Sequence, residues 1–203
     1  MSPRSPIQIF LASSNPGKLR EYRVLAGDSP IEVALLPNFS EIPVFEETAL
    51  TFAENSAGKA MHYSRFAAGT VLADDSGLVV PALGGAPGVL SARYAGPNAS
   101  DADRVRKLLR EMRDLEGEAR KARFVCITCL ARGGCALAVL SDSAEGFVTT
   151  EPKGTDGFGY DPVFFFPQLG QTYAEITREE KNQYSHRGKA FLKALAFLEG
   201  RTP

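Results

Sequence analysis

The sequence has few of the residues that build disulfide frameworks or metal clusters, and neither sign of charge dominates it. Its 203 residues include three cysteines and two histidines, and 23 basic residues stand against 24 acidic ones. A small, odd number of cysteines argues against a disulfide framework. The near-zero net charge argues against a basic nucleic-acid-binding surface over the whole chain, so we expect no nucleic-acid partner.

Long hydrophobic runs are also missing. No apolar run approaches the roughly 18 residues of a membrane-spanning helix, so we expect no membrane partner. The first six residues, Met1 to Pro6, lack the apolar core of a signal peptide, which predicts a cytoplasmic protein. A composition of 44% hydrophobic and 23% charged residues excludes a disordered chain. Since no long polar linker divides the chain, we predict one domain over residues 1–203.

Cys126 and Cys129 form a C-x-x-C pair, a spacing that occurs in zinc and redox sites. The surrounding residues 122–131 have instead the pattern of a buried strand, on which residues three apart point to opposite faces. Both histidines are far away in the sequence. We therefore predict that these cysteines are core residues.

The order of the elements predicts an α/β protein with a mixed, twisted sheet, because strands and helices alternate at first and hairpins dominate later. A Gly133-Gly134 turn is expected to join two of the strands. Asp74 to Gly77 is expected to form an acidic turn that interrupts residues 71–80. Expected strands cover residues 7–12, 33–36, 71–80, 122–131, 135–141, 146–149 and 162–166. Helices are expected from about residue 18, over 52–68, after Ser100, as a short turn after Thr177, and over 186–199.

The loop after the first strand carries Ser13, Asn15 and Lys18, whose hydroxyl, amide and ammonium groups all bind phosphate oxygens. A helix begins here, so backbone N–H groups also point toward the loop. An ordinary capped strand–helix loop explains the same residues equally well. The spacing of a Walker A loop is absent.

Two acidic clusters follow. Glu46 and Glu47 precede a predicted helix that carries Lys59, and they either serve a site or stabilise the helix N-terminus. Asp74 and Asp75 end an apolar run, where paired carboxylates are costly unless a cation or hydrogen-bond donors neutralise them. Carboxylates are the ligands that Mg²⁺ binds together with substrate phosphates, although a plain β-turn remains an alternative.

The C-terminal cluster combines a Gly-rich segment, Gly157 to Pro162, with Lys181 and with Ser185 to Arg187. Phe158 lies between two glycines, and an aromatic ring on such a loop is suited to stacking on a base. His186 alone would be explained by a hydrogen bond at a helix start. Together, the four clusters predict a site for a nucleoside polyphosphate.

The motifs that carry these clusters resemble those of the inosine triphosphate pyrophosphatase family, which hydrolyses noncanonical purine nucleoside triphosphates. They occur in the family's order over nearly the whole chain. Ser13 replaces the family's usual Thr and keeps the hydroxyl, while Ser56 and Leu90 replace Ala and Tyr at positions without charge chemistry. The matching stretches are residues 11–18, 47–55 with 59–60, 73–78, 84–88 with 91–96, 157–162, and 180–181 with 185–187.

The resemblance implies an elongated, two-lobed α/β fold with a mixed sheet, a central active-site cleft, and a homodimer. It also implies Mg²⁺-dependent hydrolysis of ITP, dITP or XTP to the monophosphate and pyrophosphate. Glu47 and Asp75 would bind the metal, supported by Glu46 and Asp74, and Asp75 would also act as the catalytic residue on water. The implied substrate-binding residues are Ser13, Asn15, Lys18, Lys59, Ser76, Phe158, Gly159, Tyr160, Asp161, Lys181, His186 and Arg187.

Two alternatives remain open at this point. A Maf-like nucleotide pyrophosphatase would share the reaction but prefer other bases, and the Phe-Gly-Tyr-Asp and Ser-His-Arg motifs argue against it. A non-hydrolysing nucleotide-binding regulatory module would be expected to lack one of the carboxylates, yet Glu47, Asp74 and Asp75 are all present.

Overall fold

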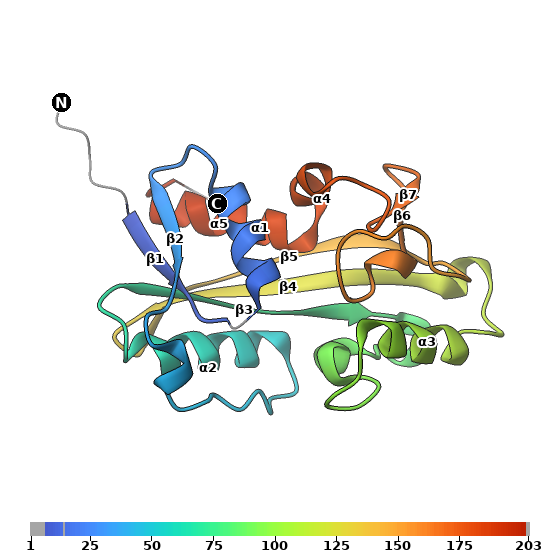
Figure 1. Cartoon of the computed structure of the whole chain (residues 1–203), viewed down its shortest axis with the longest axis horizontal. Coiled ribbons are helices and arrows are strands. Elements are labelled where there is room, and N and C mark those ends of the chain that lie inside the picture. The colour runs from blue at the N-terminus through green and yellow to red at the C-terminus, as the bar shows by residue number, and fades with distance from the viewer. Residues whose placement is uncertain (1–6, 14, 202–203) are drawn as a thin grey trace. The chain divides into compact units, whose positions relative to one another are not determined.

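The computed structural model describes residues 7–13 and 15–201 (Figure 1). Ser14, within the predicted phosphate-binding loop, and residues 1–6, on which the expected cytoplasmic location depends, lie outside the described residues. The α-helices are α1 (Pro16–Ala26), α2 (Phe52–Ser64), α3 (Asp101–Glu111), α4 (Arg178–Tyr184) and α5 (His186–Leu198). The strands are β1 (Ile7–Leu11), β2 (Ile31–Leu35), β3 (Thr70–Val79), β4 (Lys121–Arg132), β5 (Cys135–Val148), β6 (Phe164–Phe166) and β7 (Gln171–Thr172).

The strands form one mixed sheet in the order β2-β1-β3-β4-β5-β6-β7. β1 pairs in parallel with β2 and β3, whereas β5–β6 and β6–β7 are antiparallel pairs. The predicted mixed α/β class is therefore confirmed. The chain divides into two compact units, and β3, β4 and β5 each contribute residues to both. Among the described residues, the first unit holds 7–75, 126–142 and 187–201, and the second holds 76–125 and 143–186.

The first unit has helices on both faces of its strands (Figure 1). Successive strand residues point to opposite faces, so Leu72 and Leu130 pack with α1 and α5. Ala73 and Ala131, each one residue further along, pack instead with α2. This alternation gives the two faces different surroundings.

The second unit has one apolar core, built around aromatic side chains. Phe124 of β4 contacts Phe164 of β6 edge-on, with ring centroids 4.7 Å apart. The inner face of α3 contributes Val105 and Leu108 to the same core. Ser100 and Asp103 form a capping box, which fixes the start of α3 directly after Ser100, where the helix is predicted.

The expected acidic turn at Asp74–Gly77 is wrong, because β3 runs unbroken from Thr70 to Val79. The carboxylates are accommodated in the strand since each has partners, as described below. The strands expected at 135–141 and 146–149 are one strand, β5, and α2 ends at Ser64 rather than near residue 68. The predicted hairpin between β4 and β5 is confirmed, with Gly133 and Gly134 at φ of 57° and 85°.

Cys126 and Cys129 lie in β4 and are both buried, as predicted for core residues. Burial raises the pKa of the Cys126 thiol to about 12 and that of Cys129 to about 11, so both thiols stay protonated near neutral pH. Within the described part of the chain, no helix is long and apolar enough to span a bilayer.

Candidate active site

The loop between β1 and α1 is held by its own polar side chains. Asn15 is the N-cap of α1, and its Oδ1 accepts a hydrogen bond from the Gly17 amide over 2.8 Å. The Ser13 hydroxyl accepts one from the Asn15 amide over 3.1 Å. Both side chains keep donor hydrogens after these bonds, an O–H on Ser13 and the NH₂ of Asn15. The capped-loop explanation is therefore correct and leaves these side chains able to donate to phosphate.

Lys18, in the first turn of α1, is aimed at β3. Its Nζ lies 2.9 Å from Oδ1 of Asp74, whose side chain is buried. On the other carboxylate oxygen, Nε of Arg187 lies 3.4 Å from Oδ2. Although burial opposes it, the charges of Lys18 and Arg187 hold the pKa of Asp74 well below its usual range. Asp74 is thus a buried carboxylate that stays ionised between two cations.

Arg187 is itself buried, at the start of α5. Its Nη1 lies 2.5 Å from Oε2 of Glu21, which α1 supplies to the same cluster. The sequence analysis missed Glu21, and the available signal was an acidic residue on the inward face of α1. Two guanidinium nitrogens of Arg187 therefore contact carboxylates of the first unit.

Asp75, the next residue along β3, has different surroundings. Its Oδ2 accepts a hydrogen bond from Nδ2 of Asn55 over 3.1 Å. Burial raises the pKa of Asp75 to about 6, and the nearby negative charges of Glu47 and Asp74 contribute in the same direction. Among the described contacts of Asp75 no basic side chain lies within ion-pair distance. Asp75 is therefore a carboxylate whose charge is poorly compensated.

Asn55 was not singled out from the sequence, although it lies in a matching motif. Its side chain is buried on α2 and also accepts from the Ala49 amide over 3.0 Å. One amide group thus ties Asp75 to the acidic loop before α2. A buried polar residue on the inward face of a helix was the available signal.

Glu47 and Lys59 form an ion pair, with Nζ 2.6 Å from Oε1. Lys59 lies in the middle of α2, as predicted. Burial would lower the pKa of Lys59, but the charges of Glu47 and Asp74 outweigh it and raise that pKa, so Lys59 stays cationic. Glu46 is exposed. The first unit therefore holds Lys18, Lys59, Glu47, Asp74 and Asp75.

In the second unit, Asp161 and Lys181 form a buried ion pair, with Nζ 2.6 Å from Oδ2. The same Oδ2 accepts a hydrogen bond from the Phe158 amide over 2.8 Å. Lys181 also lies over the Phe158 ring, 4.7 Å from its centroid. At Gly157, with φ of 78°, a Cβ atom would come within 2.1 Å of the Asp161 carboxylate, so only glycine fits. Asp161 therefore closes the loop that carries Phe158.

The remaining predicted residues of the second unit are largely buried. The Tyr160 hydroxyl donates to the Ser91 carbonyl over 3.0 Å. The His186 ring stacks on Phe124, with centroids 4.6 Å apart and planes 7° apart. Ser76 is half-buried in β3, directly after Asp75. Phe124 was not predicted to support a site residue.

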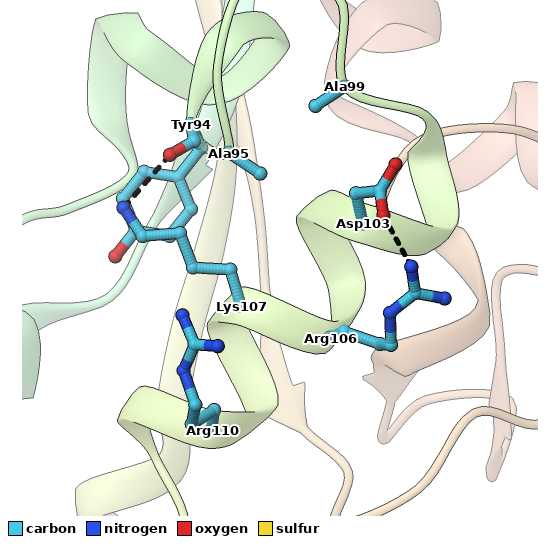
Figure 2. Close-up of a pocket in the computed structure, with 7 residues that line it drawn as sticks. All are labelled: Tyr94, Ala95, Ala99, Asp103, Arg106, Lys107 and Arg110. Carbon is cyan, nitrogen blue, oxygen red and sulfur yellow. Dashed lines mark hydrogen bonds and ion pairs between the residues drawn. The ribbon is translucent and has the colours of Figure 1, made fainter.

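A hollow of about 450 Å³ lies beside α3, and none of its lining residues is a substrate-binding, catalytic or metal-binding residue predicted from the sequence (Figure 2). Arg106 pairs with Asp103, and Nζ of Lys107 lies 2.9 Å from the Tyr94 carbonyl oxygen. The Lys107 ammonium also lies 4.1 Å from the centroid of the Tyr94 ring. The lining residues are Tyr94, Ala95, Ala99, Asp103, Arg106, Lys107 and Arg110. The sequence analysis did not predict this hollow.

The sequence model of the Ham1 family matches residues 9–197. The chain belongs to the Ham1 family. It is 48% identical to the dITP/XTP pyrophosphatase of Geobacillus kaustophilus. The match covers 92% of this chain and 91% of the relative. The dITP/XTP pyrophosphatase of Halalkalibacterium halodurans is 46% identical over 94% of this chain and 98% of its own.

Among solved structures, a HAM1 protein from Coxiella burnetii has a TM-score of 0.86 to this chain at 41% identity. The match covers 96% of this chain and 99% of that one. The family resemblance seen in the sequence motifs is thus confirmed, and the fold is that of a solved Ham1 structure.

Proposed function

We propose that the chain hydrolyses the noncanonical purine nucleoside triphosphates ITP, dITP and XTP to a nucleoside monophosphate and pyrophosphate. Its relatives named dITP/XTP pyrophosphatase support this substrate class. The observation that carries the proposal is the contrast between two neighbours on β3. Asp74 lies between Lys18 and Arg187, whereas Asp75 has an amide partner and a raised pKa. A buried carboxylate with no basic side chain within ion-pair distance among its described contacts is poised for a cation that arrives with the substrate.

Glu47 and Asp75 are the residues that we propose to hold Mg²⁺. The charge of Glu47 contributes to the raised pKa of Asp75, so a cation between the two carboxylates would relieve that repulsion. No set of three His, Cys, Asp or Glu side chains in the described part of the chain is placed to cage a metal. Mg²⁺ suits such a two-carboxylate site because it takes its other ligands from water and substrate phosphates. When bound, the ion neutralises charge on the phosphate oxygens.

The triphosphate is assigned to Ser13, Asn15, Lys18 and Lys59. The first two keep donor hydrogens after holding the β1–α1 loop, and each ammonium has three N–H donors. Asp75 orients a water molecule and accepts its proton as the water oxygen bonds to the α-phosphorus. The bond from that phosphorus to the bridging oxygen breaks, and pyrophosphate leaves. Positioning and charge neutralisation supply most of the rate.

The base end is assigned to the second unit and Arg187. Phe158 is proposed to stack on the purine, with Ser76, Gly159, Tyr160, Asp161 and Lys181 shaping its surroundings. Inosine and xanthine carry an acceptor oxygen at C6, where adenine carries a donor amine. N–H groups of His186 or Arg187 aimed at that oxygen would instead meet the donor amine of adenine, and neither group could accept the hydrogen bond. Such a mismatch lowers kcat/KM for the adenine nucleotide by a factor of roughly 10⁴.

Pyrophosphate release from ITP, dITP and XTP, with ATP and GTP as controls, tests the proposal. Release from the first three at rates well above the controls is expected. A Maf-like enzyme would prefer other bases, and a regulatory module would release nothing. In ¹⁸O-water the label should appear in IMP, and label in pyrophosphate would exclude attack at the α-phosphorus.

We also propose that the protein is a homodimer and that it is cytoplasmic. Sedimentation measures the oligomeric state directly.

A further inference from the structure

Two carboxylates from different elements hold the loop that carries Phe158. The Phe158 amide donates to Oδ2 of Asp161 over 2.8 Å, and the next amide, that of Gly159, donates to Oδ2 of Asp101 over 2.7 Å. Asp161 belongs to the loop itself. Asp101 is the first residue of α3, 58 residues earlier in the chain. The bond from Gly159 to Asp101 therefore fastens the backbone beside Phe158 to a different element, α3.

Asp101 is fixed in place by Arg104, which pairs with its other carboxylate oxygen. Nη1 of Arg104 in turn donates to the carbonyls of Ala92 and Ala99, over 2.9 and 2.7 Å. The carboxylate is thus held from behind by a side chain that is anchored to the preceding loop. A group held in this way is suited to orienting the amide that it binds.

Helix capping does not account for Asp101. Ser100 and Asp103 make the reciprocal capping bonds of α3, and Asp101 takes no part in them. Asp101 and Asp103 have similarly exposed side chains, 44% and 43%, and each pairs with an arginine three residues on. They differ in two respects: Asp103 caps the helix, and Asp101 accepts the hydrogen bond from the Gly159 amide. Asp103 lines the α3 hollow instead, as Figure 2 shows.

Gly159 has φ of 64°, a left-handed conformation that favours glycine, and a Cβ atom there would meet no neighbour within 4 Å. The space on the side-chain side of this residue is therefore open. The hydrogen bond to Asp101 is the contact that ties its backbone to α3.

We propose that Asp101 is a positioning residue, which sets the Phe158 ring for the incoming base by holding the Gly159 amide. The inference rests on the proposed stacking of the purine on Phe158. It predicts that loss of the Asp101 carboxylate weakens nucleotide binding and leaves the chemistry at Asp75 unchanged.

The test compares Asp101→Ala, Asp101→Asn and Asp103→Ala, with Phe158→Ala measured in parallel. Asp101→Ala should raise KM for ITP about fivefold, the effect of one lost hydrogen bond, with kcat little changed. Asp101→Asn should restore KM, because its amide oxygen also accepts from the Gly159 amide. Asp103→Ala removes a capping residue of the same helix and should leave KM unaltered.

Amide hydrogen exchange supplies a readout that does not depend on activity. Exchange at Gly159 should speed up in Asp101→Ala and stay slow in Asp101→Asn and Asp103→Ala. If Asp101→Ala does not fold, Asp101→Glu serves instead, since it keeps the charge at the helix N-terminus and displaces the carboxylate. Asp101→Glu should then raise KM and speed exchange at Gly159 as expected for Asp101→Ala.

Equal effects of Asp101→Ala and Asp103→Ala would mean that helix stability is the cause and would overturn the inference. So would a fall in kcat at constant KM. If Phe158→Ala raises KM and Asp101→Ala does not, the positioning role is wrong and the proposed stacking stands. If Phe158→Ala leaves KM unchanged, the stacking itself is wrong, and the role of Asp101 falls with it.

Discussion

Nδ2 of Asn55 lies 3.1 Å from Oδ2 of Asp75, and this hydrogen bond fastens the Asp75 side chain to α2. Asp74 and Asp75 are adjacent on β3, so their side chains leave the strand on opposite faces. Asp74 meets the cations of the α1 and α5 face, and Asp75 meets the amide from α2. The alternation of a strand thus gives two neighbouring carboxylates different charge environments.

Asn55→Ala should destabilise the protein by about 2–6 kcal/mol. It leaves the Ala49 amide and the Asp75 carboxylate without a buried partner, and each such loss costs about 1–3 kcal/mol. Urea unfolding measures the change. Ser56→Ala is the matched control on the next residue, because it removes a single buried bond, from Oγ to the Ala73 carbonyl. A loss no larger than that of the control would show that Asn55 does not hold the acidic loop.

Much of this site could be predicted from the sequence, since each motif carries its charge and its turn chemistry locally. Asn15 as a cap, Lys59 in mid-helix and the Gly133-Gly134 hairpin all follow from short-range rules. The acidic turn at Asp74–Gly77 was wrong for a related reason. Local rules favour a turn there, but ion pairs and hydrogen bonds from distant helices hold these residues in a buried strand.

The supporting residues could not be predicted because their roles depend on contacts between distant parts of the chain. Glu21 reaches Arg187 across 166 residues, and Asp101 reaches Gly159 across 58. Phe124 has the pattern of an ordinary core strand residue, and only the fold places it against His186. In each case the residue acts through another side chain or amide, and no local pattern records that.

Arg187→Ala should destabilise the fold by about 3–5 kcal/mol, because it removes the guanidinium from the buried carboxylates of Asp74 and Glu21 and leaves Asp74 paired with Lys18 alone. Arg187→Lys keeps the charge and should cost less. The proposed selectivity predicts that the lysine variant also lowers the ratio of kcat/KM for ITP over ATP, by about tenfold.

Lys193→Ala, which removes the partly exposed ion pair between α5 and Asp142, controls for general effects on that helix. If Arg187→Lys lowers activity on both nucleotides and their ratio is unchanged, Arg187 has no part in reading the base. Its role would then be confined to neutralising Asp74.

Phe158→Ala should raise KM for ITP roughly tenfold and leave the fold intact, since stacking on an aromatic ring is worth about 1–3 kcal/mol per base. The ring is half-buried beneath the Lys181 ammonium, so its loss costs little core packing. Steady-state kinetics together with thermal unfolding check both parts. Phe66→Ala removes an exposed aromatic ring of the first unit and should change neither.

Asp75 links the proposed catalysis to the pH dependence of stability. Its folded-state pKa of about 6 lies above the ordinary value of 3.8, so the folded protein binds this proton more tightly than the unfolded chain does. The stability that protonation contributes is therefore fully present below about pH 4 and is lost as the pH rises through 6. Asparagine resembles the protonated carboxyl and does not titrate.

Metal-free Asp75→Asn should accordingly match the wild type near pH 4 and exceed it near pH 7, by roughly 1–3 kcal/mol. Urea unfolding in EDTA at the two pH values measures this difference. Added Mg²⁺ should stabilise the wild type more than the variant, because the variant keeps only one of the two proposed ligands. The kcat of the same variant should fall by about 10²–10⁴-fold, which is the contribution of a general base. If Asp75→Asn is less stable than the wild type at pH 7 without metal, the Asp75 charge is compensated in the fold. If the variant folds and keeps near-normal turnover, Asp75 has no part in the mechanism.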